Sequence, residues 1–259
     1  MKVVILAGGW GSRLGNYTEF VPKPMLRIGT QPIIWHIIKI YSHQGFKDFI
    51  ICLGVKGNVI KDYFAHYDLE NSDFTINLST KKMEYHDHHD VPDWNVTLID
   101  TGINTFKGGR IKRVEKYLDP GVNMLTYGDG LADINLHDLL KFHKSHGKLV
   151  TITGVNPGGR FGEISEVHGK VLSFKEKPET SKSMINGGFM VFNEGMLSYL
   201  TPNEDCDFEI GPLERMAEKG EVMVYKHQGF WACMDNERDY SYLNDLWNKN
   251  KAQWKIWDR

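Results

Sequence analysis

The chain has 259 residues, with 31 Lys and Arg against 33 Asp and Glu, and 41% of its residues are hydrophobic. This length and apolar content exclude a disordered chain and a small disulfide-stapled module, and they indicate one large α/β domain or one with a small appendage. The net charge of −2 argues against non-specific binding to nucleic acid or to a membrane. The charge of any phosphorylated ligand therefore has to be met by local side chains.

The cysteines and the N-terminus bear on the compartment. Cys52, Cys206 and Cys233 are odd in number and far apart, which favours a reducing compartment over an oxidising one. The apolar run at the start of the chain is too short for a signal peptide, and no stretch approaches the roughly 18 apolar residues of a membrane span. We therefore expect a cytoplasmic protein that binds neither nucleic acid nor membranes.

The first half of the chain alternates predicted strands and helices. β-Branched residues over 2–6 predict a buried strand that ends in a glycine-rich turn. Apolar residues at helical spacing predict a helix over 33–41, which Gly45 would terminate. The alternation continues with predicted strands over 48–53, 95–100 and 123–127, and with predicted helices over 58–67 and 110–117. This order indicates a three-layer α/β fold with a mainly parallel sheet and ligand loops at the strand C-termini.

The second half is richer in predicted strands. Alternating polar residues over 71–91 predict a hairpin that leads into a mobile loop, and the stretch 212–218 resembles a short helix. Further strands are predicted over 149–155, 163–167, 171–174 and 188–192. The change of pattern places a boundary near residue 147, with residues 148–259 forming a lid or substrate region on the same sheet.

The glycine turn over residues 8–14 and the segment 22–25 are the first candidate ligand site. Adjacent glycines let backbone N–H groups approach phosphate oxygens, and Arg13 and Lys23 add positive charges that would neutralise a triphosphate. The spacing fits neither the P-loop nor the dinucleotide fingerprint. A plain strand-to-helix turn with surface cations is the alternative, but the placement of Lys23 between two prolines favours a phosphate cradle.

Two carboxylates are candidate metal ligands. Asp129 lies between Gly128 and Gly130 at the end of an apolar strand, a position that suits Mg²⁺, which usually takes one or two carboxylates plus substrate phosphates. A simple β-turn aspartate is the alternative. A magnesium site needs a second carboxylate, and Asp235 is the candidate because it also follows an apolar stretch.

Later in the chain, two segments offer groups for a sugar phosphate. Glu176 and Lys177 follow a predicted strand, and Asn186 precedes two glycines on the next one. The carboxylate would accept from sugar hydroxyls, the ammonium would pair with a phosphate, and the amide can do both. A solvated charge run between strands is the alternative.

A histidine-rich cluster over residues 86–90 raises the question of a zinc site. Consecutive histidines on a strand cannot all point at one ion, and no cysteine lies near. We therefore interpret His86, His88 and His89 as part of a solvated or lid segment. The tail tryptophans Trp247, Trp254 and Trp257 are interpreted as a packed C-terminal helix and subunit contact.

Taken in order, these segments resemble the signature of the sugar-1-phosphate nucleotidylyltransferases, and most closely that of the glucose-1-phosphate cytidylyltransferases among them. The resemblance covers nearly the whole chain. It rests on residues 6–14, 22–25, 128–129, 176–178 and 186–189, and further matching stretches occur at 94–102, 108–110, 158–162 and 229–231.

The resemblance implies roles for individual residues. Arg13, Lys23 and Asp129 would be catalytic, Asp129 and Asp235 would bind Mg²⁺, and Glu176, Lys177 and Asn186 would hold the sugar phosphate. The residues implied to contact nucleotide are Leu6, Ala7, Gly8, Gly9, Trp10, Gly11, Ser12, Arg13, Lys23, Thr105, Arg110 and Gly128.

The resemblance also implies an architecture and a reaction. The fold would be a Rossmann-like nucleotidyltransferase domain, with nucleotide bound by residues 1–147 and with sugar phosphate and neighbouring subunits bound by 148–259. The chain would assemble as a homo-oligomer, a hexamer in relatives, and would convert CTP and glucose 1-phosphate to CDP-glucose and pyrophosphate. Two alternatives stay open, namely the same chemistry with another base or sugar and a non-catalytic sensor of nucleotide or sugar phosphate.

Overall fold

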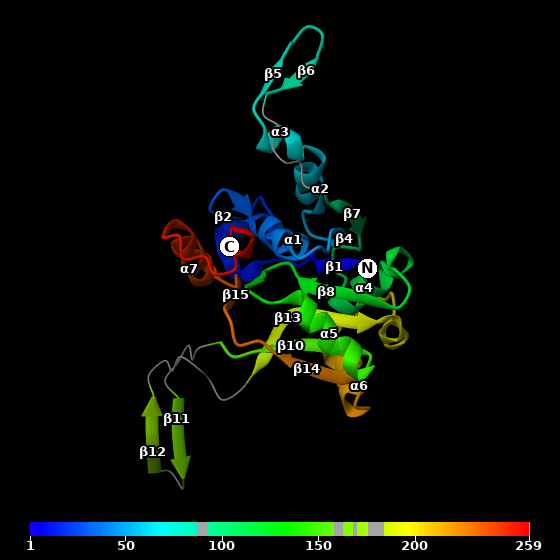
Figure 1. Ribbon diagram of the computed structural model, residues 1–259, viewed down its shortest axis with the longest axis vertical. Coiled ribbons are helices and arrows are strands. Elements are labelled where there is room, and N and C mark those ends of the chain that lie inside the picture. The colour runs from blue at the N-terminus through cyan, green and yellow to red at the C-terminus, as the bar shows by residue number, and fades with distance from the viewer. Residues whose placement is uncertain (87–92, 158–162, 168–169, 176–183, 259) are drawn as a thin grey trace.

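The protein is built around one seven-stranded sheet in the order β14-β10-β13-β8-β1-β4-β7 (Figure 1). The computed structural model describes residues 1–86, 93–157, 163–167, 170–175 and 184–258. Strand β13 runs antiparallel to its neighbours β8 and β10, whereas the other paired strands of this sheet run parallel. The bounds are β1 Val3–Leu6, β4 Asp48–Leu53, β7 Asn95–Asp100, β8 Val122–Tyr127, β10 Val150–Val155, β13 Ile185–Asn193 and β14 Val222–Lys226.

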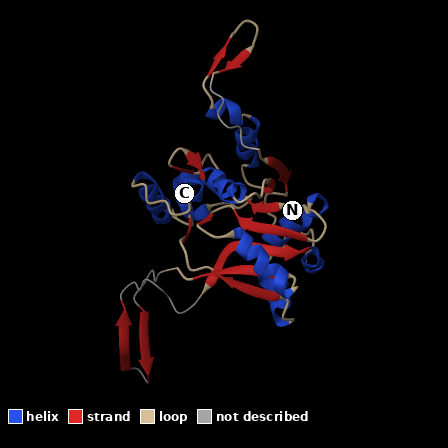
Figure 2. Ribbon diagram, viewed as in Figure 1, coloured by secondary structure: helices blue, strands red, loops and turns tan. Residues whose placement is uncertain are grey.

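Helices cover both faces of the sheet and make the fold three-layered (Figure 2). Helices α1 and α5 pack against one face and α4 and α6 against the other. None of the helices in the described ranges has the length and apolar character that crossing a membrane requires. The bounds are α1 Ile33–His43, α2 Gly57–Ala65, α3 Tyr67–Asn71, α4 Lys107–Arg113, α5 Leu136–His146, α6 Glu214–Glu218 and α7 Glu237–Asn248.

Four two-stranded sheets complete the fold. Strand β2 pairs with β3, β5 with β6, β9 with β15 and β11 with β12, each pair being antiparallel. The β9–β15 pair lies next to the ligand site argued below. Their bounds are β2 Arg27–Ile28, β3 Gln31–Pro32, β5 Phe74–Ile76, β6 Met83–Tyr85, β9 Gly130–Ala132, β11 Glu163–Val167, β12 Lys170–Lys175 and β15 Trp231–Cys233.

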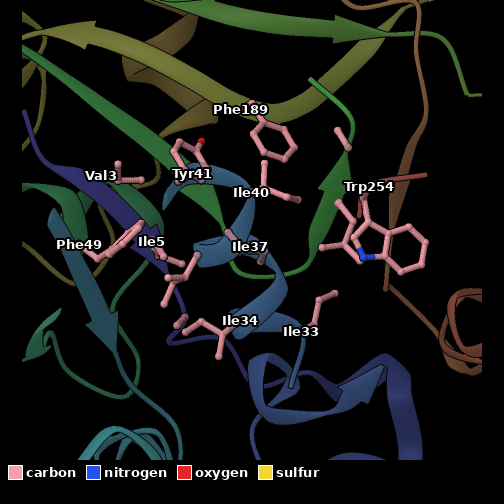
Figure 3. Close-up of a cluster of buried hydrophobic side chains, with 14 of the residues drawn as sticks. Val3, Ile5, Ile33, Ile34, Ile37, Ile40, Tyr41, Phe49, Phe189 and Trp254 are labelled. Carbon is pink, nitrogen blue, oxygen red and sulfur yellow. The ribbon is translucent and has the colours of Figure 1, made fainter. Parts of the chain in front are cut away.

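Strand β1, near the centre of the sheet, is apolar at every position. Val3 and Ile5 point into the core under α1, while Val4 and Leu6 point into the core under α4. Because successive side chains point to opposite faces, covering both faces of a strand with helices favours apolar residues along its whole length. Figure 3 shows the first of these cores, where α1 packs over the sheet beside the buried Trp254. Each large side chain that is buried this way contributes about 1.5–3 kcal/mol.

Most of the predicted elements are confirmed. The strands predicted over 48–53 and 95–100 coincide with β4 and β7, and the predicted hairpin in 71–91 is β5–β6. The helix predicted over 58–67 is interrupted at His66, which separates α2 from α3. The prediction for His86, His88 and His89 falls largely outside the described residues, although His86 Nε2 lies 2.7 Å from the hydroxyl of Thr75.

Some elements begin elsewhere or were not predicted. Helix α4 starts at Lys107, three residues earlier than predicted. The prediction began after Gly108 and Gly109, because glycine disfavours a helix, but both residues lie within α4. A Cβ on these glycines would come within 2.7 Å and 2.3 Å of the carbonyl oxygens of Asp207 and Asn203. Helix α5 was not predicted, because the buried His143 interrupts its apolar face. Strand β14 was not predicted either, because its side chains are half-buried or exposed and give no clear apolar run.

The order of strands marks where a ligand binds. After β1 the next strand of this sheet is β4, on one side, and after β8 it is β10, on the other side. The chain therefore leaves β1 and β8 in opposite directions across the sheet. The carboxyl ends of such adjacent parallel strands border a crevice that open α/β sheets use for ligands. The glycine turn follows β1 and Asp129 follows β8, so this crevice receives both.

His36 on α1 is fully buried, and both of its ring nitrogens have partners. Nε2 lies 2.9 Å from the carbonyl oxygen of Ile28, and the indole N–H of Trp254 donates to Nδ1 at 3.4 Å. A carbonyl only accepts and an indole only donates, so this arrangement requires a neutral ring with its proton on Nε2. Burial lowers the pKa of His36 to about 4.

We expect the free energy of unfolding to fall as the pH drops from 6.5 to about 4. In this window the unfolded chain binds a proton at position 36 that the folded chain excludes, and below it both states are protonated. The expected slope from His36 is about 1.4 kcal/mol for each pH unit, measured by urea unfolding. The buried His143, whose pKa is also lowered to about 4, acts in the same direction. His36→Gln keeps a donor and an acceptor and should flatten the slope, and an unchanged slope would exclude His36 as its source.

Candidate active site

A cleft of about 460 Å³ lies at the carboxyl ends of β1 and β8. It contains every residue for which the sequence implied contact with nucleotide or metal. The lining also includes residues that the sequence did not point to, chiefly from the loop before α4 and the turn before α6. The cleft is lined by Leu6, Ala7, Gly8, Gly9, Trp10, Gly11, Ser12, Arg13, Lys23, Pro24, Ile103, Asn104, Thr105, Phe106, Lys107, Arg110, Tyr127, Gly128, Asp129, Asp207, Glu209 and Asp235.

Glycines at the ends of β1 and β8 let backbone and side chains lie close together. A Cβ on Gly8 would lie 2.1 Å from Nη1 of Arg110, and a Cβ on Gly128 would lie 2.8 Å from the carbonyl oxygen of Leu6. Gly11 has a φ of 66°, a left-handed conformation that side chains disfavour. Gly8 and Gly128 are therefore required by packing within the protein, whereas a Cβ on Gly9 would meet no protein atom within 4 Å, which leaves this part of the turn open.

Arg110 is 4% exposed, and its guanidinium is directed at the protein's own backbone. Nη1 donates to the carbonyls of Leu53 and Gly102 at 2.8 Å and 2.7 Å, and Nη2 donates to that of Gly8 at 2.9 Å. Arg110 thus ties the glycine turn to the end of β4 and to the loop after β7. Its contact with nucleotide stays a prediction, and so does that of Thr105, whose hydroxyl accepts from Arg113 at 2.8 Å.

Lys23 stands at the centre of the charged part of the cleft. Its ammonium lies 2.8 Å from Oδ2 of Asp129 and 3.1 Å from Oδ1 of Asp235, and Arg13 contacts the other oxygen of Asp235. Burial alone would lower the pKa of Lys23, but the two carboxylates outweigh it and raise the pKa above its ordinary value. Lys23 is therefore a fixed positive charge at any physiological pH.

Asp129 and Asp235 are far apart in sequence, and the small sheet β9–β15 brings them together. Asp129 immediately precedes β9, and Asp235 follows β15 by two residues. Gly130 pairs with Cys233 in that sheet, and the N–H of Met234 donates to the carbonyl of Asp129 at 2.9 Å. Both carboxylates consequently face the same ammonium group from opposite strands.

The donor set of this pair fits Mg²⁺. The two carboxylates lie close together, on either side of the Lys23 ammonium, and both side chains are partly exposed, so water and phosphate oxygens can reach them. Mg²⁺ is held by one or two carboxylates plus substrate phosphates, whereas a closed protein cage would use more ligands. No cluster of three or more His, Cys, Asp or Glu suited to a metal occurs among the residues that the structure describes.

The predicted sugar-phosphate residues are only partly visible. Glu176 and Lys177 lie outside the described residues. Asn186, at the start of β13, is not part of the cleft lining but contacts Tyr127, which is. Its Nδ2 donates to the hydroxyl of Tyr127 at 3.1 Å, and its Oδ1 accepts from the N–H of Gly188 at 3.0 Å.

Sequence reasoning missed a second charged group in the cleft, made by Lys107, Tyr127, Asp207 and Glu209. Glu209 accepts from the Tyr127 hydroxyl, and its other oxygen lies 2.6 Å from Nζ of Lys107. The place of Tyr127 directly before Gly128 was a signal that could have found it. No local pattern marks Glu209, which lies in an irregular turn over residues 209–213.

Comparison with known proteins gives matches along the whole chain. Residues 2–251 match the model of the nucleotidyl transferase family. The chain is 50% identical over 259 residues to the glucose-1-phosphate cytidylyltransferase of Salmonella typhi, with all of both chains covered. It is 38% identical over 257 residues to a probable glucose-1-phosphate cytidylyltransferase of Bacillus subtilis, which covers 99% of this chain and 100% of that one.

Solved structures agree on the fold. The crystal structure of HddC from Yersinia pseudotuberculosis superposes with a TM-score of 0.69 at 23% identity, covering 95% of this chain and 99% of that one. This similarity confirms the predicted architecture of a mixed, mostly parallel sheet with flanking helices. With the family match over residues 2–251 and the full-length relatives, it follows that the chain belongs to the nucleotidyl transferase family and, within it, to the glucose-1-phosphate cytidylyltransferases.

Proposed function

We propose that this protein transfers a cytidylyl group from CTP to glucose 1-phosphate, which yields CDP-glucose and pyrophosphate. The observation that carries the proposal is the meeting of Lys23, Asp129 and Asp235 at one point of the cleft. A sensor would need no such cation-binding pair, whereas transfer between two anions does. The full-length relative from Salmonella typhi at 50% identity supports the choice of CTP and glucose 1-phosphate.

The reaction we propose is a direct in-line displacement. A phosphate oxygen of glucose 1-phosphate attacks the α-phosphorus of CTP, and pyrophosphate leaves with the electron pair of the broken P–O bond. Lys23 and Arg13 reduce the repulsion between the two anions and hold them in line, which is the main source of catalysis in such transfers. Mg²⁺, held by Asp129 and Asp235, would supply further neutralisation of phosphate charge.

The remaining site residues have proposed roles that follow from their positions. The glycine turn, Thr105 and Gly128 would contact the nucleotide, and Arg110 would shape that turn through Gly8. Asn186, together with Glu176 and Lys177, would contact the sugar phosphate. We further propose that residues 1–147 serve the nucleotide and 148–259 serve the sugar and subunit contacts.

The assembly and the compartment are also proposals. We propose a homo-oligomer, a hexamer as in the relatives that the sequence resembles, in which neighbouring subunits complete some contacts. We propose the cytoplasm as its compartment, which agrees with the odd number and the wide spacing of Cys52, Cys206 and Cys233 in the sequence.

Competition assays test the substrates. With CTP and UTP at equal concentration we expect CDP-sugar to dominate, and with glucose, galactose and mannose 1-phosphates we expect glucose to be preferred. A site built on hydrogen bonds rejects an epimer that leaves a buried polar group unpaired, by about 1–3 kcal/mol for each lost partner. A preference for UTP, or activity only with another sugar, would contradict the substrate assignment and leave the transfer mechanism standing.

A further inference from the structure

A chain of polar contacts crosses the floor of the cleft from α4 to β13. It starts at Lys107, whose Nζ lies 2.6 Å from Oε2 of Glu209. The other oxygen of Glu209 accepts from the Tyr127 hydroxyl, and the oxygen of that hydroxyl accepts from Nδ2 of Asn186 at 3.1 Å. The chain ends where Oδ1 of Asn186 accepts from the N–H of Gly188 at 3.0 Å.

The ring of Tyr127 is fixed as firmly as its hydroxyl. A Cβ on Gly188 would lie 2.6 Å from Cδ2 of Tyr127, so this glycine makes room for the ring. Nζ of Lys107 also lies 5.7 Å from the centre of the ring, within the range of a cation–π contact.

The members of this chain use their polar groups on one another. The Tyr127 hydroxyl donates a hydrogen bond to Glu209 and accepts one from Asn186, and both oxygens of Glu209 contact partners within this chain of contacts. Both ends of the Asn186 amide have a partner, which fixes its orientation and leaves the second N–H of Nδ2 and the second lone pair of Oδ1 for a substrate. Such internal use of donors and acceptors suits groups that hold other residues in place.

The two ends of this chain of contacts lie on the two sides of the cleft that the reactants would occupy. Lys107 belongs to the cleft-lining segment 103–107, next to the proposed nucleotide contacts Thr105 and Arg110. Asn186 belongs to the proposed sugar side. Tyr127, in the middle, directly precedes Gly128 and the proposed metal ligand Asp129.

We propose that Tyr127 and Glu209 are positioning residues that set the alignment between the nucleotide and the sugar phosphate. The inference rests on the proposed transfer reaction, and it goes beyond the proposed ligand contacts because neither residue has to touch a reacting atom. In-line attack depends strongly on alignment, and a misplacement of about 1 Å costs up to about a hundredfold in rate. A rigid link between the two sides of the cleft prevents such misplacement.

The test is a double-mutant cycle with Tyr127→Phe, Glu209→Gln and both together. Each single variant should lower kcat about tenfold, with the KM values for CTP and glucose 1-phosphate changed by less than about threefold. The double variant should lose about as much as one single variant, because both changes break the same link. Tyr242→Phe, which alters an exposed tyrosine on α7, is the matched control and should leave kcat unchanged.

Thermal melting of each variant separates positioning from a structural role. A lower kcat at an unchanged melting temperature indicates lost positioning, whereas a lower melting temperature indicates a weakened fold. A kcat of Tyr127→Phe within about twofold of wild type would overturn the proposal, and so would effects that multiply in the double variant. If Tyr127→Phe does not fold, Glu209→Gln alone carries the test by the same kcat criterion. If wild type is inactive with CTP and glucose 1-phosphate but active with another nucleotide and sugar phosphate, the proposed function fails, and the same cycle with that pair still tests the link.

Discussion

Asp129→Asn and Asp235→Asn should each nearly abolish Mg²⁺-dependent turnover, lowering kcat by about 10³-fold or more. Each change removes one of the two carboxylates that would hold the metal, and an amide binds Mg²⁺ much more weakly than a carboxylate does. The fold should survive, because both side chains are partly exposed and Lys23 keeps one of its two partners in either variant.

The measurement is turnover at increasing Mg²⁺ together with thermal melting. Asp68→Asn, which alters an exposed aspartate on α3, is the matched control and should leave both unchanged. Excess Mg²⁺ should restore part of the activity if affinity is the main loss. Near-normal turnover of Asp129→Asn or of Asp235→Asn would remove that residue from the metal site.

Lys23→Ala should lower kcat/KM by about 10²-fold or more. Lys23 is held between Asp129 and Asp235 with its pKa raised, so it presents a permanent positive charge where phosphate charge would shift during the transfer. Contacts of this kind strengthen in the transition state, and their loss lowers kcat as well as raising KM.

Two further variants sharpen the test of Lys23. Lys61→Ala removes an exposed lysine from α2 and should leave kcat/KM unchanged. Lys23→Arg keeps the charge but replaces a point donor by a planar fork, so it should recover only part of the rate. A kcat/KM of Lys23→Ala within about threefold of wild type would mean that this lysine serves the fold alone.

Local sequence patterns predicted the fold well wherever burial on both faces forced a run of apolar residues. Strand β4 follows from such a run, and helix α1 follows from apolar residues at helical spacing, whereas strand β7 lies at the edge of the sheet and is only half-buried. The pattern did not predict α5, where His143 stands at a buried position of the helix that an apolar residue would usually hold. It also did not predict the place of β13 within the sheet. The antiparallel placement of β13 between β8 and β10 depends on pairing between distant segments, and spacing within a segment carries no information about that pairing.

Only part of the candidate site's membership was predictable from the sequence, and its geometry was not. The glycine turn, Lys23 and Asp129 stand at strand ends or between prolines, and such positions can be found from the sequence. The convergence of Asp129 and Asp235 depends on the pairing of β9 with β15. The link through Glu209 could not be predicted, because its turn has no regular spacing and its partners come from other parts of the chain.

The most direct test of the central claim is the release of pyrophosphate by the purified wild-type chain with CTP, glucose 1-phosphate and Mg²⁺. We predict that pyrophosphate and CDP-glucose form in equal amounts, and only when all three components are present. Pyrophosphate release from CTP without the sugar phosphate would show hydrolysis instead of transfer. Tight binding of CTP without any turnover, across a panel of sugar 1-phosphates, would contradict the assignment of this cleft to nucleotidyl transfer.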